Sequence, residues 1–133
     1  NGIYLSDDMD TLQKKVMSMY TDPDHIKIED PGKIEGNMVF HYLDVFGRPE
    51  DARKITAMKE HYQRGGLGDV KTKRYLLELL ERELGPIRER RVEFSKDMGA
   101  VYTMLQKGSE KARQVASQTL SDVKSAMGIN YFK

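Results

Sequence analysis

A single stretch, from Gly65 to Arg91, restricts the fold of this chain more than any other. It opens with Gly65-Gly66-Leu67-Gly68, where three glycines in four positions indicate a turn. Asp69 follows at the position expected of a helix N-cap, and apolar residues then recur at helical spacing. The stretch therefore predicts a long helix with a broad apolar face on which other segments can pack. The residues of that face are Val70, Leu76, Leu77, Leu79, Leu80, Leu84 and Ile87.

Proline and glycine residues predict where the chain bends after this face. Pro86 lies inside the long helix, where it removes one backbone hydrogen bond, so we expect a kink there. The apolar pattern restarts near Asp97 and predicts a short helix. Gly108 and Ser109 are expected to break that helix and to begin a final one, which Gly128 ends.

The first third of the chain predicts one helix and a long loop. The acidic residues Asp7 and Asp8 precede Leu12 and Val16 at helical spacing, which indicates a helix that ends near Tyr20. Residues 21–36 contain two proline turns and no helical pattern. We expect this span to be a loop, and long loops in compact domains are often functional.

Two further helices are predicted between this loop and the glycine turn. Asn37 caps the first, which is apolar nearly all round and is therefore expected to be buried, and Gly47 ends it. Pro49 begins the second, and Gly65 ends it. Taken together, these segments predict an all-α helical bundle with a long, kinked central helix and a long loop near the N-terminus.

Composition limits the class of protein. The chain has 133 residues, enough for one ordinary domain, and no cysteine, so it has neither disulfides nor thiolate metal sites. No apolar run approaches the roughly 20 residues that a membrane helix needs, and no stretch resembles a secretory signal. We therefore expect a cytoplasmic protein without a membrane partner.

Charge is distributed unevenly along the chain. The net charge is +1, yet residues 1–47 carry four lysines and nine acidic residues, which gives −5 there and +6 in the remainder. A basic part that follows an acidic one favours a polyanionic partner. Solvated helix surfaces with mixed charges explain the same composition equally well.

Candidate catalytic and metal sites are few. The three histidines His25, His41 and His61 have no partner at ligand spacing, and no serine lies in the setting of a catalytic nucleophile. The acidic residues between positions 22 and 30 do not match the calcium-binding pattern of an EF-hand. The glycine turn before Asp69 matches neither common nucleotide-binding motif. We expect no catalytic residue, metal or cofactor site in this chain.

The basic residues are the remaining candidates for function. Arginine and lysine on the long helix and on the last helix can neutralise the phosphates of a nucleic acid. The alternative is a set of solvated helix faces with local ion pairs. The candidates are Lys71, Arg74, Arg88, Arg90, Arg91, Lys111 and Arg113.

Several long motifs resemble one known family. They are residues 17–23 (MSMYTDP), 29–37 (EDPGKIEGN), 65–91, 108–113 (GSEKAR) and 126–128 (AMG). Together they look like the C-terminal part of bacterial tryptophanyl-tRNA synthetases, which are class I aminoacyl-tRNA synthetases. The resemblance covers almost the whole chain.

The resemblance implies a parent protein with two domains of different function. Family members carry a Rossmann catalytic domain that activates tryptophan with ATP and Mg, followed by a helical domain that binds the anticodon arm of tRNA(Trp), and they act as homodimers. Their His-Ile-Gly-His-like and Lys-Met-Ser-Lys-Ser-like signatures are absent here. Residues 1–36 are then expected to link from the missing catalytic domain, and residues 37–133 to form the tRNA-binding domain. A chain of this extent is expected to be inactive alone, although its parent is a ligase.

The resemblance makes tRNA the expected partner of the basic residues and gives no reason to expect DNA. Anticodon recognition uses bases stacked on aromatic or arginine planes, for which Tyr75, Tyr102 and Arg91 are candidates. An alternative from another class is a free-standing helical module that binds proteins and has no role with RNA.

Overall fold

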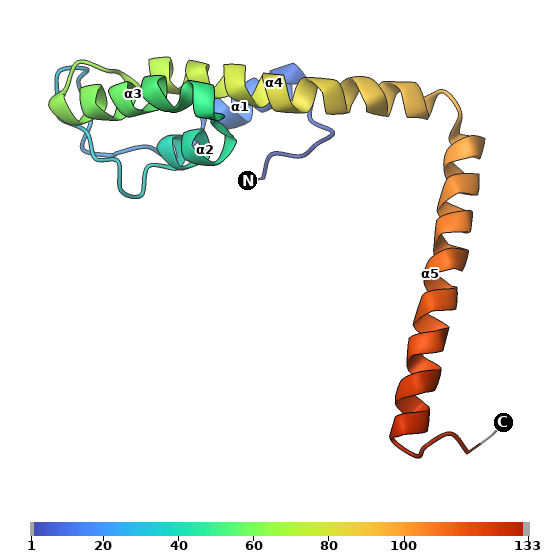
Figure 1. Cartoon of the computed structure of the whole chain (residues 1–133). Helices are drawn as coiled ribbons and strands as arrows, with labels where there is room; N and C mark the ends of the chain where they lie inside the picture. The colour runs from blue at the N-terminus through green and yellow to red at the C-terminus, as the bar shows by residue number, and fades with distance from the viewer. Residues whose placement is uncertain (1, 132–133) are drawn as a thin grey trace. The chain divides into compact units, whose positions relative to one another are not determined.

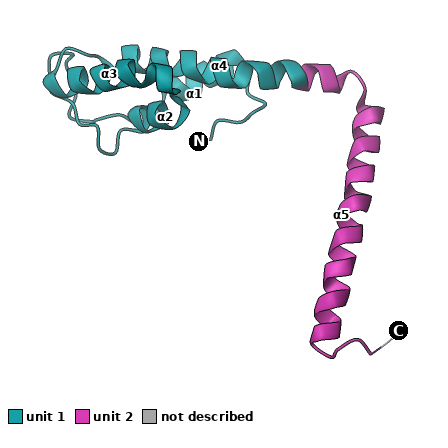
Figure 2. Ribbon diagram, in the orientation of Figure 1, with its two compact units in different colours: residues 1–90 teal, residues 91–133 magenta. Residues whose placement is uncertain are grey.

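The computed structural model describes residues 2–131, and these residues form helices joined by loops, with no β-strand among them (Figure 1). The predicted all-α fold is therefore confirmed. The elements are α1 (Met9–Met17), α2 (Met38–Phe46), the 3₁₀ helix η1 (Pro49–Asp51), α3 (Ala52–Arg64), α4 (Asp69–Ser95) and α5 (Met98–Ala126). They belong to two compact units, residues 1–90 and residues 91–133 (Figure 2).

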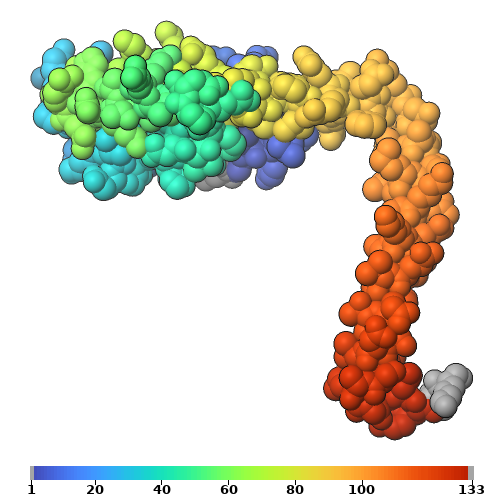
Figure 3. Space-filling view, viewed as in Figure 1, coloured from blue at the N-terminus to red at the C-terminus, as the bar shows by residue number. Residues whose placement is uncertain are grey.

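The first unit has one hydrophobic core. Helices α1, α2 and α3 and the leucine face of α4 each contribute apolar side chains to it, and on the face seen in Figure 3 these elements lie directly against one another. Eleven of the buried side chains come from α1, α2 and α4: Leu12, Val16, Val39, Phe40, Leu43, Tyr75, Leu76, Leu77, Leu79, Leu80 and Leu84. Ile55, Tyr62 and Leu67 complete the core.

Capping side chains fix the first two helices where the sequence predicted them. Asp8 accepts a hydrogen bond from the Thr11 N–H at 2.8 Å, and Asn37 accepts one from the Val39 N–H at 3.0 Å. Helix α1 ends at Met17, close to the predicted end near Tyr20. Residues 21–36 contain no helix or strand, as predicted.

Helix α2 is less buried than expected. Val39, Phe40 and Leu43 lie in the core, whereas Val45 is 63% exposed. A helix of nine residues that packs on a single core buries only the side facing that core. The prediction of all-round burial was therefore wrong for this unit.

The glycine turn after α3 has a steric reason. Gly65 ends α3 with φ of +85°, a conformation that side chains rarely adopt. A β-carbon at this position would also overlap the carbonyl oxygen of Glu29. The turn therefore brings the long loop and the end of α3 into direct backbone contact, where the Gly66 N–H donates to the Ile28 carbonyl at 2.6 Å.

Two details of α4 differ from expectation. Asp69 is its first residue rather than its N-cap, and its carboxylate binds side chains of other elements. Val70 is 56% exposed and does not belong to the apolar face, because it lies in the first turn beside the exposed Lys71. The helix continues through Pro86 to Ser95, and the kink at Pro86 stays a prediction.

The second unit consists of the end of α4, helix α5 and the turn that follows. Asp97 caps α5 by accepting from the Ala100 N–H at 2.9 Å. The predicted break at Gly108 is wrong: α5 runs unbroken from Met98 to Ala126. One glycine costs only about 1 kcal/mol relative to alanine, and the good helix formers around it outweigh that cost. Gly128, with φ of +66°, ends the helix as predicted.

The two compact units, residues 1–90 and 91–133, have other boundaries than the expected domains, residues 1–36 and 37–133. Leu12 and Val16 from the first 36 residues lie in the same core as the residues that follow. The assignment of residues 1–36 as a linking segment supposes a catalytic domain ahead of them, so this assignment and that of residues 37–133 stay predictions.

Candidate nucleic-acid interface

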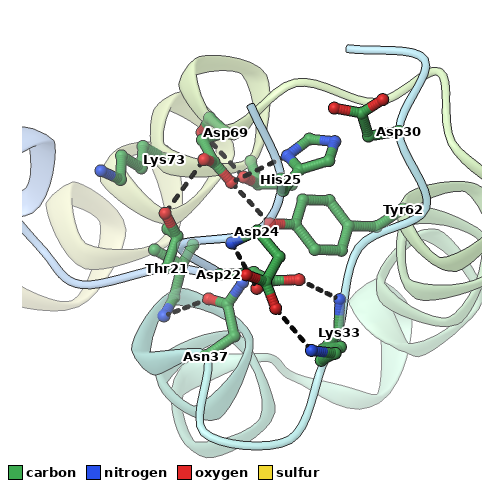
Figure 4. Close-up of polar contacts among 12 residues, drawn as sticks. Thr21, Asp22, Asp24, His25, Asp30, Lys33, Asn37, Tyr62, Asp69 and Lys73 are labelled. Carbon is green, nitrogen blue, oxygen red and sulfur yellow. Dashed lines mark hydrogen bonds and ion pairs between the residues drawn. The ribbon is translucent and has the colours of Figure 1, made fainter. Parts of the chain in front are cut away.

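A cluster of polar side chains fixes the long loop against α3 and α4 (Figure 4). The Asp69 carboxylate accepts hydrogen bonds from the Thr21 hydroxyl at 2.9 Å and from the Tyr62 hydroxyl at 2.8 Å. The His25 Nδ1 atom lies 3.8 Å from the same carboxylate, and its ring lies 4.5 Å from the Tyr62 ring. Burial and the bond to Asp69 raise the pKa of the Tyr62 hydroxyl, so that it stays a neutral donor.

A second carboxylate closes the loop on itself. Asp22 accepts backbone N–H groups from Lys33 at 2.7 Å and from Asp24 at 3.0 Å (Figure 4). These hydrogen bonds lower the pKa of Asp22, since they stabilise its charged form. The loop is therefore held by side chains at both ends rather than by regular secondary structure.

A third carboxylate joins the start of α3 to the middle of α4. Asp51 accepts from the Arg82 guanidinium at 2.7 Å, from the Arg48 N–H at 2.9 Å and from the Tyr75 hydroxyl at 3.1 Å. The bond with Arg82 and that with the Arg48 backbone lower the pKa of Asp51. This arrangement fixes α3 beside α4 and orients the ring of Tyr75.

A surface depression lies between these two helices. Its rim carries the cations Lys54, Lys71 and Arg74, one carboxylate, Glu78, and the ring of His61. Ala57, Met58, Leu67 and Tyr75 complete its lining. Positive charge therefore exceeds negative charge around this depression.

Lys54 was not among the predicted residues. Its Nζ atom lies 3.5 Å from the centroid of the Tyr75 ring, in a cation–π contact, and 4.0 Å from the nearer Glu78 oxygen. The sequence signal that could have found it is helical spacing, because Lys54, Met58 and His61 recur at intervals of four and three on α3.

The four predicted tRNA-binding residues of the first unit differ in how accessible they are. Lys71 and Arg74 are exposed and line the depression, and Arg90 is exposed near the end of the unit. Arg88 is different: its guanidinium pairs with Glu81, and its side chain is only 19% exposed. It is the least accessible of the four.

The remaining predicted residues lie in the second unit. Arg91, Lys111 and Arg113 are exposed, and Arg91 borders a small depression that is lined mainly by apolar side chains, including Phe94 and Met98. Of the aromatic candidates for base stacking, Tyr75 is 7% exposed and Tyr102 is 67% exposed. Of these two rings, only that of Tyr102 is free for stacking.

Within residues 2–131, no three His, Asp or Glu side chains gather as ligands for a metal ion. None of the helices in this part of the chain is long and apolar enough to cross a membrane.

Comparison with known proteins defines the class. Residues 1–85, more than half of the chain, match the family described as tRNA synthetases class I (W and Y). The chain therefore belongs to the class I tRNA synthetases of this family.

The relatives are more specific. The chain is 83% identical over 132 residues to tryptophan–tRNA ligase of Streptococcus pneumoniae serotype 4, and 79% identical over 133 residues to that of Streptococcus agalactiae serotype V. These matches cover 99% and 100% of this chain and 39% of each relative. The crystal structure of tryptophanyl-tRNA synthetase from Campylobacter jejuni is similar over 96% of this chain and 40% of its own, with 26% identity and a TM-score of 0.73. The chain thus spans about two fifths of the length of these relatives.

Proposed function

We propose that this chain is the tRNA-binding helical segment of a tryptophan–tRNA ligase. The observation that carries the proposal is the 83% identity, over 99% of the chain, to a protein of that name. The full-length protein would activate tryptophan with ATP and Mg and attach it to tRNA(Trp), as a homodimer in the cytoplasm. Residues 1–36 would lead from the catalytic domain, and residues 37–133 would contact the tRNA.

In this proposal, the activation of tryptophan belongs to residues outside this chain. The two nucleotide-binding signatures of the family are absent from its sequence. The carboxylate of Asp69 also stands at the start of α4, where it would repel a phosphate at the helix N-terminus. The contribution of this chain is to bind and position tRNA.

The exposed basic residues support that contribution. Lys71, Arg74 and Arg90 in the first unit, and Arg91, Lys111 and Arg113 in the second, are all accessible to a ligand. Phosphate contacts from such residues position a nucleic acid without reading its sequence. Arg88 has its charge already paired with Glu81 and would contribute less.

The test compares the full-length protein with the 133-residue chain. We expect the full-length protein to exchange pyrophosphate into ATP in the presence of tryptophan and to charge tRNA(Trp). The 133-residue chain should show no exchange above a buffer control. A full-length protein that activates another amino acid, such as tyrosine, in preference to tryptophan would contradict the proposal.

A further inference from the structure

We propose that the depression between α3 and α4 is a seat for a backbone phosphate of RNA, held by Lys54, Lys71 and Arg74. The inference rests on the proposed function and assigns the contact to a particular site. It adds Lys54, which was not among the residues predicted from the sequence. It also assigns Lys71 and Arg74, but none of the other predicted basic residues, to this site.

The cations of the first unit differ in whether a carboxylate pairs with them. Seven have a carboxylate within 4.0 Å: Lys15, Lys33, Arg48, Lys54, Lys59, Arg82 and Arg88. By contrast, no carboxylate of residues 2–131 lies within 4.0 Å of the charged groups of Lys71 or Arg74. Their charge is available to an external anion.

Lys54 is held at one side of the depression and is only weakly paired. The face of the Tyr75 ring holds its ammonium group at the edge of the depression. Its carboxylate neighbour Glu78 is 4.0 Å away, and the side chains of both are more than half exposed. Such a pair contributes little to stability, so Lys54 can turn to a phosphate at small cost.

Hydrogen bonds hold the two helices around the depression in place. Asp51 accepts from the Tyr75 hydroxyl and from Arg82, which ties the floor of the depression to both helices. The three cations therefore line one depression whose helices are already ordered. An ordered backbone reduces the conformational entropy that is lost when a ligand binds.

The lining favours a phosphate over a base as the ligand. It offers cations and apolar side chains, and its largest ring, Tyr75, is 7% exposed and covered by Lys54. The ring of His61 is half-buried beside Gly66. A base therefore has no fully exposed aromatic face to stack on, whereas a phosphate meets three cations. The site is suited to the sugar–phosphate backbone and to binding that is independent of base identity.

The experiment measures binding of tRNA(Trp) to the full-length protein at several salt concentrations. The test variant carries Lys71→Gln and Arg74→Gln, and a second variant carries Lys54→Gln alone. The control carries Lys14→Gln and Lys27→Gln, two exposed lysines in the same unit that do not line the depression. Test and control lose the same charge, so a difference between them reports the site rather than net charge. Circular dichroism checks that all variants are folded.

We expect the test variant to raise the Kd for tRNA by about tenfold or more and to reduce the slope of log affinity against log salt by about 1. Lys54→Gln should change both in the same direction and by less, and the control should match the unmodified protein. A test variant that behaves like the control would overturn the proposal. So would a loss of affinity that depends on the base sequence of the RNA.

The two proposals fail in different ways. Normal charging of tRNA(Trp) with an unaltered Kd in the test variant would remove the phosphate seat and leave the ligase function intact. Failure of the unmodified protein to charge tRNA(Trp), together with weaker RNA binding in the test variant, would reject the ligase function and support the seat.

Discussion

The carboxylate of Asp69 has a role that local sequence does not give. The pattern of a glycine turn followed by an acidic residue predicted an N-cap, which needs partners two or three residues away. The hydrogen-bond donors are instead Thr21 and Tyr62, which are 48 and 7 residues away. Lys54 was missed for a related reason, because its contact with Tyr75 depends on how α3 and α4 are placed. Partners across elements follow from packing, which residue spacing alone does not determine.

Asp51 leads to a prediction about pH. Its pKa is lower in the folded chain than the ordinary value of about 3.9, so its ionised form stabilises the folded state above that value. This contribution is lost as the pH falls through the acidic range. We expect Asp51→Asn to lower the Tm clearly at pH 6 and by a smaller amount at pH 3, where part of the contribution of the ionised form has been lost, as measured by thermal unfolding of the chain. Asp10→Asn, at an exposed position of α1, is the control. A gap in Tm that does not change with pH would show that Asp51 acts through its shape and not its charge.

At the scale of the element, sequence patterns were most successful where local chemistry decides the outcome. The cap Asn37 and the glycine stops at Gly47 and Gly65 were predicted from residue type and position. The starts of α1 after Asp8 and of α5 after Asp97 were also predicted, although the capping role of these two residues was not. The sequence patterns failed at Gly108 in α5, because one glycine is a weak break signal among strong helix formers. They also failed at α2, because periodicity shows that a helix face is apolar but not whether the fold buries that face.

Helix α4 allows a direct test of which of its apolar residues form the core. Leu80 is 1% exposed, whereas Val70, which the pattern also placed on the apolar face, is 56% exposed. We expect Leu80→Ala to lower the free energy of unfolding by about 2–5 kcal/mol, the usual cost of a large-to-small change in a core. Val70→Ala, the control on the same helix, should change it by less than about 0.5 kcal/mol. Urea unfolding followed by circular dichroism measures both, and equal effects would mean that the assigned core face is wrong.

At the scale of the whole molecule, the sequence predicted the fold class and the family, and the comparisons agree with both. The long motifs sufficed for the family because they extend over most of the chain, and 83% identity to a relative supports the same assignment. The division into units was not predicted. The division depends on which helix faces pack against other helices within these 133 residues, and the sequence motifs do not show which faces pack.

The second unit gives the last prediction. Helix α5 has 29 residues and none of them is buried, although apolar residues such as Leu105, Val115 and Val123 recur along it at helical spacing. Most helical stability in proteins comes from packing an apolar face, and an unpacked helix opens often. We therefore expect the amides of α5 to exchange with deuterium much faster than those of residues 72–84 of α4 in the 133-residue chain, as measured by mass spectrometry.

The full-length protein proposed above should behave differently. This chain spans 39% of the length of its relatives, so the proposed full-length protein would have residues outside it that can cover the apolar face of α5. We expect α5 to become strongly protected in the full-length protein, while residues 72–84, already packed in the core of the first unit, keep nearly the same exchange rate. The exchange rate of the α5 amides in the 133-residue chain is measured at high dilution. If it is as slow as in the full-length protein, the helix needs no packing partner from outside these residues.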